Sequence, residues 1–284
     1  MEARIIVDSC CDLLPHMRKD VYVAPLKITI NDTHEYIDDG SVDIPALIAD
    51  MASTDRPARS ACPSPEAYLA LMRGADTCFV ITLSSRLSGS YNAASLARTM
   101  ALEEEPARRI HIFDSESAAA GEALLLLYLQ ALLATELDYQ AVIERMDHRI
   151  AQMHTLFVLD DLSNLIKNGR LNKIAGKLAT ALAIHPLLSD DGHGEIRMMA
   201  MARGMKSALR SLVSHVGDLT KAAPAKSVEL VMTFCNCPQR AQEVRDMILE
   251  SCAAISDVVM IPTGALSSMY AADGGVVVAF EGNA

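Results

Sequence analysis

The sequence predicts an α/β protein of two domains, the first built on a parallel sheet and the second on a mixed sheet. In the first half, short apolar runs alternate with helix-compatible segments, the pattern of βαβ units and hence of a parallel sheet. Around Gln152–His154 this pattern changes, although no linker rich in glycine, serine or proline marks the place. A length of 284 residues suits two medium-sized domains. We therefore expect domains over 1–152 and 153–284.

The composition is that of a folded globular chain, with 51% hydrophobic and 21% charged residues. The longest apolar stretch, Ala118–Thr135, contains Glu122 and Gln130 and is shorter than the roughly 20 apolar residues that span a bilayer. It predicts a buried helix. The first residues show neither the apolar region nor the cleavage site of a signal peptide. We therefore expect a cytoplasmic protein without stable membrane insertion.

Charge and cysteine spacing argue against two kinds of partner. A formal net charge of −11 disfavours nucleic acid, which is bound through clustered lysine and arginine. The seven cysteines lack the paired CxxC spacing of zinc sites and disulfide frameworks. Cys235 and Cys237 alternate like residues on one face of a strand, so we interpret them as packing residues. Reduced thiols and no metal site are expected.

The elements of the first half begin with three apolar strands, which are Arg4–Val7, Thr77–Leu83 and Ile110–Phe113. A helix after the first strand is expected to begin near Cys11 or Asp12, and Pro15 limits it. Residues 64–66, Ser-Pro-Glu, have the N-cap, first-turn proline and first-turn acid of a helix through Met72.

The second half is predicted as a mixed sheet with helices on one face. Gly169 is well placed to end a helix, and the turn-rich residues 189–194 join the two strands of a hairpin. In chain order we expect a strand at Leu156–Leu159, helices over Asp161–Gly169 and Leu171–Ile184, hairpin strands at Pro186–Leu188 and Glu195–Met201, a helix from Met205, a strand at Val228–Phe234, a helix over Pro238–Cys252, and strands near Val258 and Val276.

Polar side chains follow each strand of the first half. They are Asp8 and Ser9, Ser84 and Ser85, and Asp114 and Ser115. Ligands bind at the carboxyl ends of parallel strands, so we expect these side chains to converge at a site.

The segment Ser84–Ser90 joins a strand to a helix that starts near Tyr91. Backbone N–H groups at such a helix start attract an anion, Gly89 allows close approach, and Ser88 offers a hydroxyl donor. A carboxylate or a phosphate suits this loop. A serine-rich helix cap without a ligand explains the same residues equally well.

Two further residues have a functional and a structural interpretation. Ser60 lies in a loop before Pro63, for which a turn is predicted, and is either a second hydroxyl donor or a turn residue. Arg203 ends a strand-like segment and either neutralises an anion across a cleft or lies at a solvated edge.

No GxSxG, HExxH or GxxxxGK[ST] motif is present, so the residues give no catalytic constellation.

Taken together, these motifs resemble the DegV family. Residues 5–9 match its apolar strand followed by Asp-Ser, and residues 84–92 follow its specific SSxLSGTYN signature. The match continues through its LxxLxxGGRL segment and covers nearly the whole chain. The other matching residues are Pro25, Leu26, Asp38, Asp39, Asp114, Ser115, Leu162, Leu165, Lys167, Gly169, Arg170, Leu171, His185 and Pro186.

The resemblance implies a three-layer α/β/α domain with a parallel sheet plus a smaller two-layer α/β domain with a mixed sheet. It also implies a long-chain fatty acid between the domains, with Ser60, Ser88, Gly89 and Tyr270 at its carboxylate. Some members present the acid to a separate ATP-binding fatty-acid kinase subunit for phospholipid synthesis. Arg170 and Arg203 are then expected in the head-group network or the docking surface. No catalytic residue, metal or cofactor is implied in this chain.

The chain departs from the family pattern at three places. The TSQP block reads Ser60-Ala61-Cys62-Pro63, the GGR block begins with Asn168, and Tyr270 stands where the family has a histidine. A phenol donates a hydrogen bond but stays neutral at pH 7, so the head-group electrostatics differ. Two alternatives remain: a small-molecule kinase-like or hydrolytic enzyme of related fold, and a divergent lipid-sensing interaction module.

Overall fold

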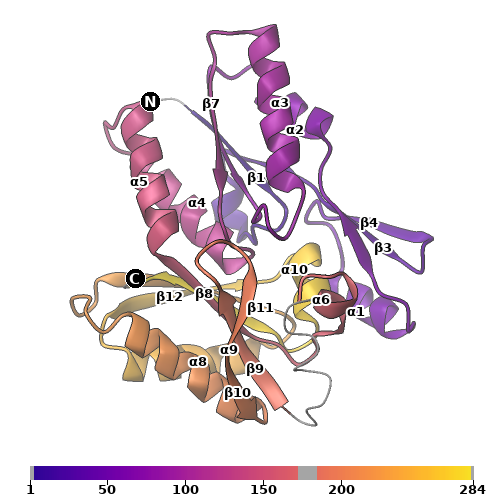
Figure 1. The fold of residues 1–284 in the computed structure, drawn as a ribbon, viewed down its shortest axis with the longest axis vertical. Helices are drawn as coiled ribbons and strands as arrows, with labels where there is room; N and C mark the ends of the chain where they lie inside the picture. Colours follow the sequence, from indigo (N-terminus) through magenta and orange to yellow (C-terminus); the bar gives the residue numbers. More distant parts are fainter. Residues whose placement is uncertain (1–2, 172–183, 283–284) are drawn as a thin grey trace.

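The first sheet is parallel, as the alternating apolar runs predict (Figure 1). The computed structural model describes residues 3–171 and 184–282. Helices α2 and α3 pack on one face of this sheet and α4 and α5 on the other, which gives three layers. In spatial order the strands are β2 (Val21–Ala24), β1 (Arg4–Asp8), β6 (Thr77–Thr82) and β7 (Arg109–Asp114). The helices are α2 (Pro65–Met72), α3 (Ser90–Glu104), α4 (Ala120–Leu133) and α5 (Tyr139–Gln152).

The second sheet is mixed and has six strands in the order β10–β9–β8–β13–β11–β12. Only the β11–β12 pair is parallel among its described strand pairs. The strands are β8 (Met153–Val158), β9 (Ile184–Asp190), β10 (Ile196–Arg203), β11 (Val228–Phe234), β12 (Ile255–Pro262) and β13 (Val276–Glu281). The predicted α/β class, with a parallel sheet and a separate mixed sheet, is therefore confirmed.

Helices α8 (Met205–Leu219) and α9 (Pro238–Ser251) cover one face of the mixed sheet. The predicted hairpin of β9 and β10 and both helices are confirmed. The opposite face carries Val231, Ile261 and Ala279, which pack against α4. The buried helix predicted from the 118–135 stretch thus lies between the two sheets, a position that the sequence prediction did not include.

Local signals set several helix ends as predicted. The Ser64 Oγ accepts a hydrogen bond from Ala67 N at 3.2 Å and so caps α2. Helix α6 (Ser163–Lys167) ends in a left-handed Gly169 at φ +81°. Arg170 N donates to the Leu165 carbonyl, and Gly169 N to that of Ile166, as in a Schellman motif. The next predicted helix, over Leu171–Ile184, falls mainly on 172–183, outside the described residues, and Ile184 itself begins β9.

Three local predictions were wrong. The turn expected at 59–63 is largely strand β5 (Arg59–Ala61), because β3 (Lys27–Ile30) offers it an antiparallel partner. After β1, the Asp8 carboxylate accepts from Cys10 N, and Pro15 opens only the short 3₁₀ helix η1 (Pro15–Arg18) in place of an α-helix. Cys235 and Cys237 follow β11 in its loop to α9, so they do not share a strand face.

A small third sheet extends from one side of the molecule (Figure 1). It consists of β4 (His34–Ile37), β3 and β5, and α1 (Ile44–Ala52) lies in the chain between β4 and β5. Helix α10 (Ala265–Ala271) contacts both α1 and α6, so the end of the chain closes onto the first half here. Helix α5 ends at Gln152 and β8 begins at Met153, the junction where we placed the boundary between 1–152 and 153–284.

Candidate functional site

A cavity lies where the parallel sheet meets the mixed sheet. Its atom-free space, including the open mouth, is about 930 Å³. Cys10, Leu83 and Ala118, which follow β1, β6 and β7, line one side, so the carboxyl edge of the parallel sheet forms that wall. The mixed sheet contributes the opposite wall. Most of the lining is apolar, including Leu26, Leu87, Phe157, Leu159, Leu165 and Val277.

Four predicted site residues meet at this cavity. Ser60 Oγ and Tyr270 Oη lie 2.9 Å apart, although 210 positions separate them in the chain. The Arg170 guanidinium lies 5.7 Å from the centroid of the Tyr270 ring and donates to the carbonyls of Leu87 and Asn168. Ser88 lines the same cavity. Hydroxyls and a guanidinium, the groups that bind a carboxylate, are thus placed together.

The two remaining predicted residues do not line the cavity. Gly89 is the N-cap residue directly before α3, and a Cβ at this position would lie 3.0 Å from Cys62 Sγ. The absence of a side chain at Gly89 therefore leaves room for Cys62, whereas its φ of −79° is one that any residue can adopt. Arg203 is exposed at the end of β10, where it pairs with Ile184. The structure does not bring Arg203 to the four lining residues.

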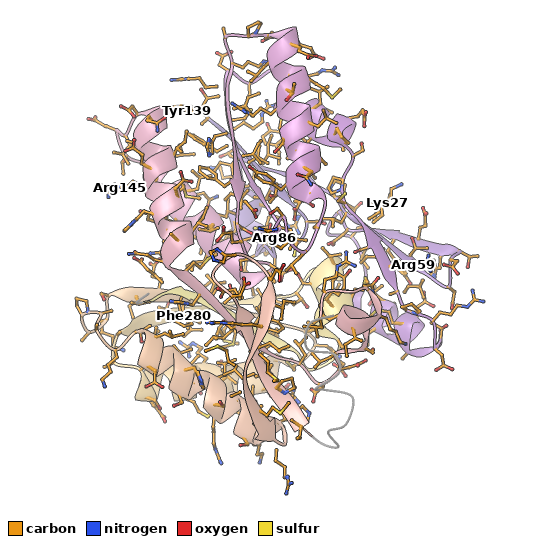
Figure 2. The ribbon with its side chains drawn as sticks, viewed as in Figure 1. Lys27, Arg59, Arg86, Tyr139, Arg145 and Phe280 are labelled. Carbon is orange, nitrogen blue, oxygen red and sulfur yellow. The ribbon has the colours of Figure 1, made fainter. Side chains whose placement is uncertain are left out.

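The predicted convergence of polar residues after the strands of the parallel sheet is confirmed. Asp8 Oδ2 accepts from Leu83 N at 2.9 Å, and Asp114 Oδ1 accepts from Ser85 N at 3.0 Å. The Ser84 hydroxyl donates to the Gly194 carbonyl in the β9–β10 hairpin, which joins the two halves. These residues mainly fix the loops around the cavity. Figure 2 shows Arg86, in the same loop as Ser85, near the middle of the molecule.

Two buried carboxyl groups that sequence reasoning did not select position the Tyr270 helix. Asp38 accepts from Ala265 N and Leu266 N at 3.1 and 3.0 Å, and Asp12 Oδ1 accepts from Gly264 N at 2.7 Å. Both carboxyls therefore hold the start of α10 from segments more than 220 positions away. No local sequence signal connects them to that helix.

Burial raises the pKa values of the acids at this end of the parallel sheet. The pKa of Asp8 rises to about 6 and that of Asp12 to about 8, while backbone N–H donors oppose the shift in both. Burial and the nearby Asp8 raise the pKa of Glu122 well above its ordinary value. With a pKa of about 8, Asp12 is mainly protonated at pH 7.

Within 3–171 and 184–282, no group of three or more His, Cys, Asp or Glu side chains has the geometry of a metal site. In the same ranges no helix is long and apolar enough to cross a membrane.

The fold and the cavity define a class of α/β proteins with a mainly apolar internal site between a parallel and a mixed sheet. The chain belongs to the DegV family. The family model described as an uncharacterised protein of the DegV family matches residues 2–282. A DegV domain-containing protein of Streptococcus pneumoniae strain R6 is 34% identical over 285 residues, covering 99% of each chain.

Solved structures of similar chains contain fatty acids. A DegV-family protein from Ruminococcus gnavus, refined with vaccenic acid, has a TM-score of 0.91 and 36% identity, covering 98% of this chain and 99% of its own. The Streptococcus pneumoniae Fatty Acid Kinase (Fak) B3 protein, loaded with linoleic acid, has a TM-score of 0.90 and 33% identity, with both chains covered completely. A Eubacterium eligens DegV protein loaded with heptadecanoic acid has a TM-score of 0.90 and 28% identity, covering 99% and 100%.

Proposed function

We propose that this chain binds a long-chain fatty acid in the cavity between its two sheets. The carboxylate lies at Ser60, Ser88, Tyr270 and Arg170, and the acyl chain follows the apolar walls. The observation that carries this proposal is the Ser60–Tyr270 hydroxyl contact at the edge of a mainly apolar cavity. The fatty acids in the similar solved structures support the same ligand class.

The hydroxyl pair is suited to a carboxylate. Ser60 and Tyr270 have two hydroxyl hydrogens between them, and their mutual hydrogen bond uses one. The second is available for a ligand oxygen, and the Arg170 guanidinium supplies positive charge nearby. Burial of the tail contributes about 0.8 kcal/mol per methylene group. The tail thus supplies affinity, and the polar cluster sets the orientation.

We further propose that the bound carboxylate is presented to a separate ATP-dependent kinase subunit. The name of the similar Fak B3 protein supports this role. In this account the chain itself supplies no catalytic residue, because phosphoryl transfer depends mainly on positioning and on metal-bound ATP from the partner. Arg203 is exposed, so it is accessible for docking of the kinase subunit. Gly89 lets Cys62 pack closely beside the loop that carries Ser88.

The test combines lipid binding with kinase coupling. Delipidated protein is titrated with palmitate or oleate, and Arg170→Gln is expected to weaken binding while Arg210→Gln, on α8 and outside the cavity, leaves it unchanged. A purified DegV-dependent fatty-acid kinase subunit with ATP then reports acyl-phosphate formation. ATP turnover by the isolated chain would support an enzyme instead. Lipid binding without any coupling would retain the carrier and reject the kinase role.

A further inference from the structure

The cavity has a second polar region, formed by the hydroxyls of Ser117 and Thr155. Both residues line the cavity, and only 4% and 6% of their surfaces are exposed. Their oxygens lie 2.6 Å apart. Among the described residues neither hydroxyl has another hydrogen-bond partner, so one of the two hydrogens and several lone pairs are unused. A saturated acyl chain passing here leaves them unsatisfied, which costs binding free energy.

In the described part of the chain, the Ser117 and Thr155 hydroxyls share no hydrogen bond with the carboxylate cluster. Thr155, Phe157 and Leu159 alternate along β8 and its continuation, and all three line the cavity. Phe157 and Leu159 pack in the same apolar cluster as Tyr270. Two residues of extended chain, at about 3.3 Å each, place Thr155 about 7 Å from Phe157 along the strand. A ligand held at Tyr270 and extended along β8 would meet the pair with its tail.

The surroundings of the pair favour a hydrogen-bond donor and disfavour a second anion. Two acidic residues, Glu116 and Asp190, also line the cavity. Asp190 Oδ2 accepts from Thr155 N at 2.8 Å, so its carboxylate lies beside the pair. Burial and nearby Asp114 raise the pKa of Glu116, which is consistent with an acidic and partly desolvated region. A neutral hydroxyl fits these acceptors, whereas a carboxylate is repelled.

We propose that the cavity selects a fatty acid whose tail carries a hydroxyl group, and that the Ser117–Thr155 pair receives that hydroxyl. The inference rests on the proposed fatty-acid function and adds a substrate class to it. The same polar region fixes the direction of the ligand, because a carboxylate entering this end meets the acidic Glu116 and Asp190, while the other end offers Arg170 and the unused hydroxyl hydrogen of the Ser60–Tyr270 pair.

The test compares stearate, a positional series of hydroxystearates and a dicarboxylate of equal length on the delipidated full chain. One mid-chain hydroxystearate should bind about fivefold more tightly than stearate, the effect of one net hydrogen bond. The dicarboxylate should bind more weakly than stearate. Thr155→Val should abolish the preference for the hydroxyl, so that stearate and every hydroxystearate bind with the same affinity. The matched control is Thr220→Val, a buried threonine in the loop after α8 whose hydroxyl bonds to the Val216 carbonyl.

The outcomes separate the two proposals. If the wild-type chain binds stearate and every hydroxystearate equally, the inference is wrong and the fatty-acid function remains. If no fatty acid binds, the proposed function itself fails. A third outcome is that Thr155→Val and Ser117→Ala weaken the binding of every ligand equally while circular dichroism shows intact folding. The pair would then only connect the loop after β7 to β8, and this result would also overturn the inference.

Discussion

At the scale of single residues, Tyr270 determines how the head group can be held. It stands where the resemblance implies a histidine, and its phenol lies 2.9 Å from the Ser60 hydroxyl. A histidine titrates near pH 6.5, whereas a phenol stays neutral through the physiological range. Tyr270 therefore brings a hydroxyl group and no imidazole to the cluster, and the positive charge of the cluster comes from Arg170.

Replacement of Tyr270 by phenylalanine tests this contact. The change removes one donor and keeps the ring, so the fatty-acid Kd should rise roughly 10- to 100-fold, as expected for one hydrogen bond to a charged group. Isothermal titration with palmitate measures it. Tyr36→Phe is the control, because its phenol donates to Asp50 away from the cavity. An unchanged Kd in Tyr270→Phe would remove the phenol from the head-group site.

At the scale of elements, the sequence predicts those strands and helix ends that are determined by residues close together in the chain. The three strands that contain Arg4, Thr77 and Ile110 are apolar runs, and they were predicted correctly. The helix cap at Ser64 and the helix end at Gly169 are also local signals and were predicted correctly. Strand β5 was missed because its stability comes from pairing with β3 about 30 positions away. The grouping of Ser60, Ser88, Arg170 and Tyr270 followed from motif resemblance, since no spacing in the chain connects them.

The fixed position of α10 depends on distant carboxyls, which gives a second prediction. Asp38→Ala leaves two buried backbone N–H groups at the start of this helix without their partner. The free energy of unfolding should fall by about 2–3 kcal/mol, and fatty-acid affinity should fall because Tyr270 moves with the helix. Chemical denaturation and palmitate titration measure the two effects.

The control for this prediction is Asp43→Ala, which removes the exposed cap of α1. It should cost about 1 kcal/mol of stability and leave lipid affinity unchanged. If Asp38→Ala is as mild as Asp43→Ala and binds palmitate normally, the carboxyl does not position Tyr270.

At the scale of the whole molecule, helix α4 lies between the two sheets and carries Glu122, whose carboxyl group is fully buried close to Asp8 and Cys10. Asp8 and Asp12 belong to the same buried acidic region. Burial favours the neutral, protonated form of these carboxyl groups, which lie where the cavity loops and the two halves of the chain meet. Stability of the whole fold should therefore depend on pH.

The direction of this dependence follows from the raised pKa values of Asp8, about 6, and Asp12, about 8, against 3.8 for the ordinary group. Between about pH 4 and the raised pKa of each group, the folded chain binds more protons than the unfolded chain. The stabilising contribution of both groups is complete below about pH 4 and is lost as the pH rises through about 6 and then 8. Urea denaturation from about pH 5 to 8 should show a falling free energy of unfolding.

Asp12→Asn should flatten the alkaline part of this profile, because the amide oxygen still accepts from Gly264 N and does not ionise. Asp39→Asn is the control, since the pKa of exposed Asp39 is lowered by its bonds to Ser41 and lies outside this pH range. A profile that is unchanged by Asp12→Asn would show that Asp12 does not titrate in the folded protein.

The central claim is that a single fatty acid occupies the cavity between the sheets. Native mass spectrometry of the delipidated chain, before and after addition of palmitate or oleate, tests it most directly. We predict one added acyl mass per chain, lost or strongly reduced when Arg170→Gln and Tyr270→Phe are combined, and retained in Arg210→Gln. A protein that keeps its unliganded mass at saturating fatty acid would contradict the account.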